Sequence, residues 1–148
     1  MVNLKTLVDF ASSVLGIVRN IRADEKDRLQ RVAKLLGQIA DCMQRIIDAA
    51  RKGEWGPLNG NCEELGAYFQ RFGELDLGPF LSDQDKQLLR QLEEAIIARR
   101  GSLLAFEFGG YGKNPTIEQK ASIEQNVVQM EKAAGSFRAA QNLLLATA

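Results

Sequence analysis

Histidine is absent from this sequence of 148 residues. The absence removes the most common general base, the Ser–His and Cys–His nucleophilic pairs, and the Glu-x-x-His ligand pattern of di-iron helical bundles. The adjacent carboxylates Glu63 and Glu64 would point about 100° apart on a helix, which does not suit a shared proton. We therefore expect no enzyme activity, no cofactor and no metal site.

Cysteine is scarce: Cys42 and Cys62 are the only two, and they show neither CxxC spacing nor the density of a secreted disulfide scaffold. Both fall on the apolar stripes of expected helices. We therefore expect free thiols that pack as small hydrophobic side chains in a reducing compartment.

The chain has no net charge, with 19 basic and 19 acidic residues, so no overall field attracts nucleic acid. Aromatic residues are not interleaved with basic ones, which also argues against a nucleic-acid partner. The charge is uneven, however, at a net +4 for residues 1–53 and −5 for residues 54–112. This complementarity suits helices packed side by side, solvated faces that happen to balance, or a basic end facing an anionic partner.

No hydrophobic run reaches the roughly 20 residues that a membrane-spanning helix needs. The barest stretch, "LVDFASSVLGIV" at residues 7–18, contains Asp9. It is a poor signal peptide too, because Lys5 is the only early basic residue and no good cleavage site follows. We expect a protein that is soluble in at least one state.

Helical periodicity is present almost everywhere, whereas alternation by two, which is typical of strands, never persists. Apolar spacing predicts helices over residues 3–22 and 24–52, a short third helix from Asn61 and a fourth from Ser82. A last helix runs to the end and begins either at Asn114, with Pro115 as its first residue, or at Thr116. The sequence therefore predicts an all-α bundle of four to five helices, mostly antiparallel, with short loops. We expect residues 1–148 to form one domain, the N-terminal module of a longer protein.

Helix starts and stops are marked by local signals. Residues 53–61, "GEWGPLNGN", form the clearest predicted loop, with Gly53 ending the second helix in a left-handed conformation. Three pairs spaced by three residues predict capping boxes at helix starts. They are Asn61 with Glu64, Ser82 with Asp85, and Thr116 with Gln119.

Apolar residues spaced by three and four mark the inward seams of two of these helices. In the second helix the predicted seam consists of Leu29, Val32, Leu36, Ile39, Met43, Ile46 and Ala50. In the last helix it consists of Ile117, Ile123, Val127, Met130, Ala134, Phe137 and Leu144.

The first predicted helix is apolar around more than half of its circumference. Its large apolar residues are Leu4, Leu7, Val8, Phe10, Val14, Leu15, Ile17, Val18 and Ile21. Only Lys5, Asp9, Ser12, Gly16 and Arg19 or Asn20 form a narrow polar strip.

Three interpretations suit this helix. It is the central member of the bundle, or it offers a surface to another copy or domain, or it leaves the bundle, oligomerises and enters a membrane. In the third case nearby basic residues would contact anionic lipid, although the acidic residues at 24, 25 and 27 oppose this. These basic residues are Arg19, Arg22, Lys26, Arg28 and Arg31.

The apolar "LVDFASSVLGIVRNIR" and the seam "LQRVAKLLGQIADCMQRII", in this helix order, resemble four-helix cell-death effector domains. These are the fungal HeLo domain, the N-terminal bundle of the mixed-lineage-kinase-like pseudokinase and the prokaryotic Bell domains.

The resemblance implies a cytoplasmic module in bacterial immunity or programmed death, held inactive until an upstream signalling protein clusters it. The homo-oligomer would then permeabilise the membrane lipids at the inner face of the plasma membrane, with the first helix inserted. The alternative is a non-enzymatic helical adaptor that mediates protein–protein interaction or oligomerisation.

Overall fold

The computed structural model describes residues 4–21, 25–75, 77, 80–97, 104–105, 107–109 and 114–147. Its long elements are all helices, and no strand occurs among these residues, which confirms the predicted all-α bundle. The helices are α1 (Leu4–Arg19), α2 (Lys26–Lys52), α3 (Trp55–Gly73), α4 (Asp83–Ile97) and α6 (Ile117–Thr147).

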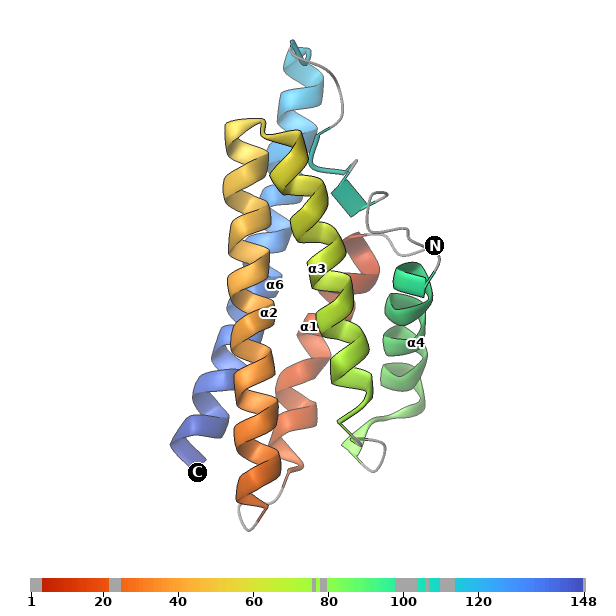
Figure 1. Cartoon of the computed structure of the whole chain (residues 1–148), viewed down its shortest axis with the longest axis vertical. Coiled ribbons are helices and arrows are strands. Elements are labelled where there is room, and N and C mark those ends of the chain that lie inside the picture. The colour runs from red at the N-terminus through yellow and green to blue at the C-terminus, as the bar shows by residue number, and fades with distance from the viewer. Residues whose placement is uncertain are drawn as a thin grey trace.

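Successive helices run in opposite directions (Figure 1). The end of α1, the start of α2, the end of α3, the start of α4 and the end of α6 therefore lie together, at the lower end of the bundle in this view. We call this end the lower pole. The closest contacts link α1 to α6, α6 to α2, α2 to α3, α3 to α4 and α4 back to α1, so the helices form a closed ring around one core.

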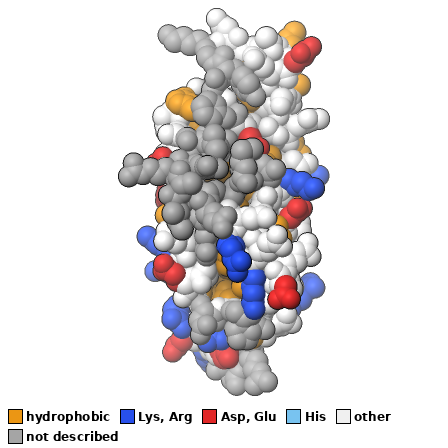
Figure 2. Space-filling view, turned by 90° about the vertical axis from the view of Figure 1, so that its right-hand side faces the viewer, with side chains coloured by type: hydrophobic (Ala, Val, Ile, Leu, Met, Phe, Trp, Pro, Cys, Tyr) orange, Lys and Arg blue, Asp and Glu red, His pale blue; other side chains and the backbone are white. Residues whose placement is uncertain are grey.

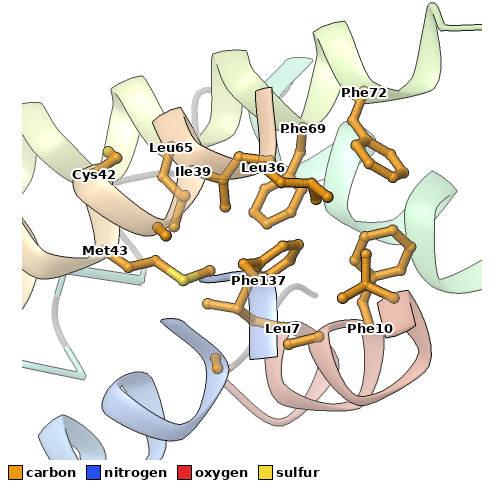
Figure 3. Close-up of a cluster of buried hydrophobic side chains, with 14 of the residues drawn as sticks. Leu7, Phe10, Leu36, Ile39, Cys42, Met43, Leu65, Phe69, Phe72 and Phe137 are labelled. Carbon is orange, nitrogen blue, oxygen red and sulfur yellow. The ribbon is translucent and has the colours of Figure 1, made fainter. Parts of the chain in front are cut away.

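Four phenylalanine side chains form the centre of this core (Figure 3). The Phe10 ring meets Phe72 edge to face at a centroid distance of 5.6 Å and Phe69 at 6.0 Å. Phe137 lies 6.3 Å from Phe10 and 6.0 Å from Phe69. This aromatic cluster joins α1, α3 and α6, and edge-to-face pairs contribute about 0.5–1.5 kcal/mol beyond their buried area.

The predicted seams are largely confirmed. All seven seam residues of α2 are buried, and in α6 four are buried while Ile123 and Ala134 are partly buried. Ile117 was wrongly predicted to be inward, since 87% of it is exposed. The reason is that the first turns of α6 extend beyond the turn between α2 and α3, where none of the described helices covers them (Figure 1).

The predicted loop at 53–61 is wrong, because α3 already begins at Trp55. Gly53 ends α2 with φ +68°, and the Glu54 backbone N–H donates to the Ala49 carbonyl at 3.0 Å. The chain therefore reverses its direction between α2 and α3 within two residues. Pro57 is tolerated because it is the third residue of α3, where a backbone N–H has no partner within the helix.

The capping boxes predicted at Ser82 and at Thr116 are confirmed. The Ser82 hydroxyl accepts the Asp85 backbone N–H at 3.1 Å, and the Asp85 carboxylate accepts the Ser82 N–H at 3.3 Å. Thr116 and Gln119 exchange the same two bonds at 3.1 and 2.8 Å. These reciprocal bonds satisfy donors that helix starts leave unpaired.

Replacing Phe137 with Ala should lower the free energy of unfolding by about 3–5 kcal/mol, because it leaves a cavity in the aromatic cluster. Ile117→Ala on the same helix is the matched control and should change it by less than about 0.5 kcal/mol. Urea denaturation followed by circular dichroism measures both. Equal losses would mean that the cluster is not the centre of the core.

Candidate functional site

Helix α1 directs its apolar face into its own bundle. Val8 and Leu15 are half-buried at the edge of the core, and the other predicted apolar residues are buried. These are Leu4, Leu7, Phe10, Val14, Ile17, Val18 and Ile21. The polar strip faces outward, since Lys5, Asp9, Ser12, Gly16 and Arg19 are all exposed. In this folded state α1 is therefore a core helix, as in the first of the three interpretations.

Both ends of α1 are tied to the bundle. At its start, the Leu4 backbone N–H donates to a carboxylate oxygen of Glu107 at 2.9 Å. At its end, the backbone N–H groups of Asn20 and Ile21 donate to the carbonyls of Ile17 and Val18, each at 3.2 Å. Ile21 is 5% exposed, so the chain remains packed for two residues beyond the helix.

The basic residues predicted as lipid contacts lie at the lower pole, apart from Arg22, which falls outside the described residues. Lys26, Arg28 and Arg31 line one shallow hollow together with Glu25 and Asp27. The structure thus brings three of the five predicted cations together, but it also places two carboxylates among them.

These cations differ in what they bind. Arg28 pairs with Glu25 at 3.2 Å and lies 5.7 Å from the ring centre of Phe80, so it holds the segment between α3 and α4. Within the described part of the chain, Arg19, Lys26 and Arg31 form no ion pair. Of the predicted lipid contacts that the structure describes, these three are the exposed ones without an ion pair, although the Arg31 Nε–H donates to the backbone carbonyl of Asp27 at 3.3 Å.

Lys34 was not among the predicted contacts, although it lines an adjoining hollow with Asp27, Gln30 and Arg31. It is exposed and lies three residues after Arg31, on the same side of α2. That spacing was the signal in the sequence that could have identified it.

The surface on the α4 side of the bundle carries mixed charge (Figure 2). Acidic and basic side chains are interspersed over the part of this face that the structure describes, and hydrophobic side chains show only as small separate areas. This face therefore offers no broad patch of one kind among the described residues.

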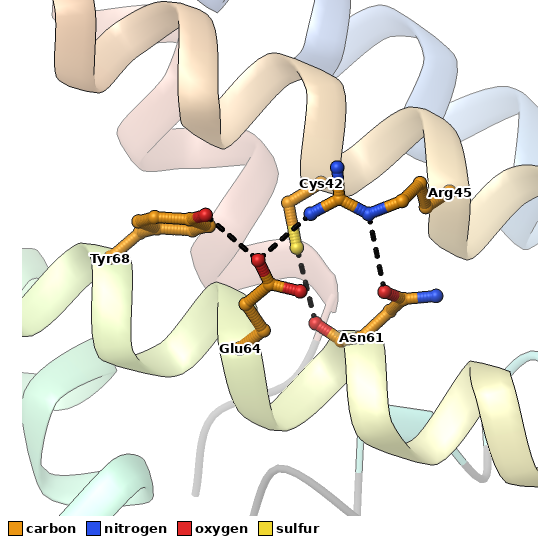
Figure 4. A network of polar contacts seen from close by, with 5 residues as sticks. All are labelled: Cys42, Arg45, Asn61, Glu64 and Tyr68. Atoms are coloured by element: carbon orange, nitrogen blue, oxygen red, sulfur yellow. Dashed lines mark hydrogen bonds and ion pairs between the residues drawn. The ribbon is translucent and has the colours of Figure 1, made fainter.

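A polar network joins the middle of α2 to α3 (Figure 4). Arg45 donates to Glu64 at 2.9 Å and to the Asn61 side chain at 3.3 Å, and the Tyr68 hydroxyl donates to Glu64 at 2.7 Å. The predicted capping box of Asn61 and Glu64 is therefore wrong: both lie inside α3 and face α2. Since the charges of Arg45 and Glu64 satisfy each other, this network stabilises the helix pair.

Ion pairs also connect α2 to α6. Arg138 pairs with Asp41 at 2.6 Å, and Arg51 pairs with both Glu131 and Glu124. These pairs are half exposed, so each contributes little to stability. They show, however, that from Asp41 onward α2 carries several charges matched to its neighbours, whereas Lys26, Arg31 and Lys34 near its start are not.

No known protein clarifies the site. No protein-family model, no curated protein and no solved structure matches this chain. The resemblance to cell-death effector bundles therefore stays a prediction from the sequence. In the described residues, no group of acidic or cysteine side chains is placed to hold a metal ion, and none of the helices has the length and apolarity to cross a bilayer.

The two thiols are buried, as predicted, and free. The Cys42 thiol donates to the backbone carbonyl of Asn61 at 3.2 Å. Burial raises the pKa of both thiols to about 12, from an ordinary value of 9.0. A folded-state pKa above the unfolded value means that this contribution to stability is present below pH 9 and is lost as the pH rises toward 12.

We expect neither thiol to react with a disulfide reagent at pH 8 while the protein is folded, because little thiolate forms. Ser12→Cys, which places a thiol on the exposed strip of α1, is the control and should react within minutes. Absorbance of the released chromophore gives both rates. A wild-type rate equal to that of the control would contradict the burial of Cys42 and Cys62.

Proposed function

We propose that this chain is a membrane-permeabilising effector module in which α1 leaves the bundle when several copies cluster. The observation that carries this proposal is the make-up of α1. It has a wide apolar face, a narrow polar strip and, immediately after it, cations that no described residue pairs. The proposal includes anionic membrane lipids and further copies of the chain as partners, with an upstream protein that clusters them.

The dimensions of α1 suit a helix that lies along the membrane interface. Its 16 residues extend about 24 Å, shorter than the roughly 30 Å of hydrocarbon in a bilayer. The strip containing Lys5, Asp9 and Arg19 would face the headgroups while the opposite face enters the acyl boundary. Arg19, Lys26 and Arg31 would lie at the same level, where each basic residue contributes about 1 kcal/mol near anionic lipid.

Energetics favour release only when a new apolar environment is available. Burying a large aliphatic or aromatic side chain stabilises by about 1.5–3 kcal/mol, so exposing the α1 face to water would exceed the stability of most small domains. Transfer into lipid restores most of that contribution. Clustering is needed as well, because departure of Phe10 exposes Phe72 and Phe137, which a second copy could cover.

Leu15→Lys tests this role of α1. Leu15 is half-buried, so its replacement should leave the bundle folded with the lysine stem along the surface, yet it removes a leucine whose burial at the acyl boundary would contribute about 1.5–3 kcal/mol. We expect at least about a tenfold slower release of dye from vesicles containing phosphatidylglycerol. The chain is clustered through a biotin at its carboxyl end by streptavidin.

Gln87→Lys is the matched control, since it adds the same charge at an exposed position of α4 and should leak dye as the wild type does. Thermal melting of all three proteins excludes unfolding as the cause. Equal leakage by Leu15→Lys and wild type would remove α1 from the mechanism. Absence of leakage from the clustered wild type would remove the proposal.

A second candidate is the non-enzymatic adaptor, and one observation favours it. The outer side of α6 exposes Val128 and Leu145, at 39% and 56%, which are among the few exposed large hydrophobic side chains of the described residues. Because they lie about 25 Å apart along α6, each would add a separate apolar contact with a partner and not one continuous patch. If Val128→Asp abolishes self-association or partner binding while Leu15→Lys does not, the adaptor is the better description.

A further inference from the structure

The side chain of Glu107 accepts a hydrogen bond from the backbone at the start of α1. It belongs to the connection between α4 and α6. Leu104, Ala105 and Phe108 of this connection are buried in the core, and backbone bonds of 3.1 and 3.0 Å turn the chain at Glu107 and Phe108. The carboxyl group is thereby held half-buried beside the first turn of α1.

Two hydrogen bonds make Glu107 a junction of three elements. Its carboxylate accepts the Leu4 backbone N–H at 2.9 Å, across 103 residues of sequence. Its backbone carbonyl accepts the side-chain amide of Asn126 in α6 at 2.6 Å. A displacement of α6 or of the connection would therefore be transmitted directly to the start of α1.

Two opposing effects act on the carboxylate. The first N–H of a helix has no partner within the helix, and the helix dipole favours a negative charge there. Burial disfavours that charge, and it outweighs the bond from Leu4, so the pKa of Glu107 is raised. The elements around it bring no described cation into an ion pair: α1 offers a backbone amide, α6 offers neutral Asn126, and α3 offers Cys62, whose pKa the carboxylate helps to raise.

We propose that Glu107 is a clasp that holds the first turn of α1 in the bundle, and that opening of this clasp controls the release of α1. The inference rests on the proposed function in one respect only, namely that the released α1 acts on a membrane. The bond itself, and its effect on the docking of α1, stand independently of that function.

The charge of Glu107 has two opposite effects. The hydrogen bond from Leu4 lowers the pKa of this carboxyl group, so the bond itself is stronger to the ionised form. Burial raises the pKa by more, so the folded chain as a whole is stabilised by the protonated form; this contribution is complete below the ordinary carboxyl pKa of 4.5 and is lost as the pH rises through the raised value. The clasp bond therefore strengthens as Glu107 ionises, while the burial of its charge opposes it.

Hydrogen exchange of the full-length chain tests the clasp without a membrane. Glu107→Ala removes the acceptor and should speed exchange of the α1 amides at residues 8–15 by about tenfold, while α2 exchanges as in the wild type. Asn126→Ala should act in the same direction. The matched controls Glu63→Ala and Gln125→Ala alter exposed neighbours on α3 and α6 and should leave α1 unchanged.

Glu107→Gln separates the charge from the hydrogen bond, since the amide oxygen still accepts from Leu4. At pH 7 the α1 amides of this variant should exchange faster than in the wild type, because the bond from Leu4 to a neutral acceptor is weaker, but more slowly than in Glu107→Ala, which has no acceptor. Slower exchange than in the wild type at pH 7 would overturn the effect of charge. Unchanged α1 exchange in Glu107→Ala, or equal acceleration in α1 and α2, would overturn the clasp.

Dye release from the vesicles described above distinguishes this inference from the proposed function. If Glu107→Ala loosens α1 and leaks dye faster than the wild type, both are supported. If it loosens α1 but no clustered protein leaks dye, the clasp is supported and the membrane function is overturned. If the wild type leaks dye while Glu107→Ala leaves α1 docked, the membrane function is supported and the clasp is overturned.

Discussion

Phe10 binds the first helix into the rest of the bundle. Its ring is fully buried and meets the edges or faces of Phe69, Phe72 and Phe137, so one side chain of α1 touches both α3 and α6. Because protein interiors pack densely, these four rings depend on one another for their positions. Docking of α1 and completion of the core are therefore the same event, and any function that requires α1 to leave must replace this contact.

The start of α1 is held differently from its middle. The aromatic cluster secures the centre through buried area, whereas the start combines the buried Leu4 and Leu7 side chains with the hydrogen bond from the Leu4 N–H to Glu107. Local opening begins where few apolar contacts oppose it. Glu107 and Asn126 thus lie where a small displacement of the connection between α4 and α6 would have the largest effect on α1.

In the described structure, the charges of α2 form ion pairs with neighbouring helices in its second half and not near its start. Arg45 and Arg51 are matched by carboxylates of α3 and α6, which aligns the three longest helices. Lys26, Arg31 and Lys34, close to the junction with α1, have no such partner in the described structure. An anionic surface that approached the lower pole would meet these charges and the end of α1 together.

Periodicity in the sequence was enough to predict the order of the helices, the seven-residue seam of α2 and the burial of Cys42 and Cys62, because each depends on spacing within a single helix. It was not enough to predict the start of α3, which lies at Trp55 instead of Asn61. The boxes at Ser82 and Thr116 were predictable for the same reason, since both partners lie within one turn. Asn61 and Glu64 show the same spacing but bind Arg45 instead, and Ile117 fits the seam but lies beyond its neighbours. Only the tertiary structure decided these cases, along with the contact between Leu4 and Glu107, because the partners are brought together by packing of distant helices and no local pattern records which helices become neighbours.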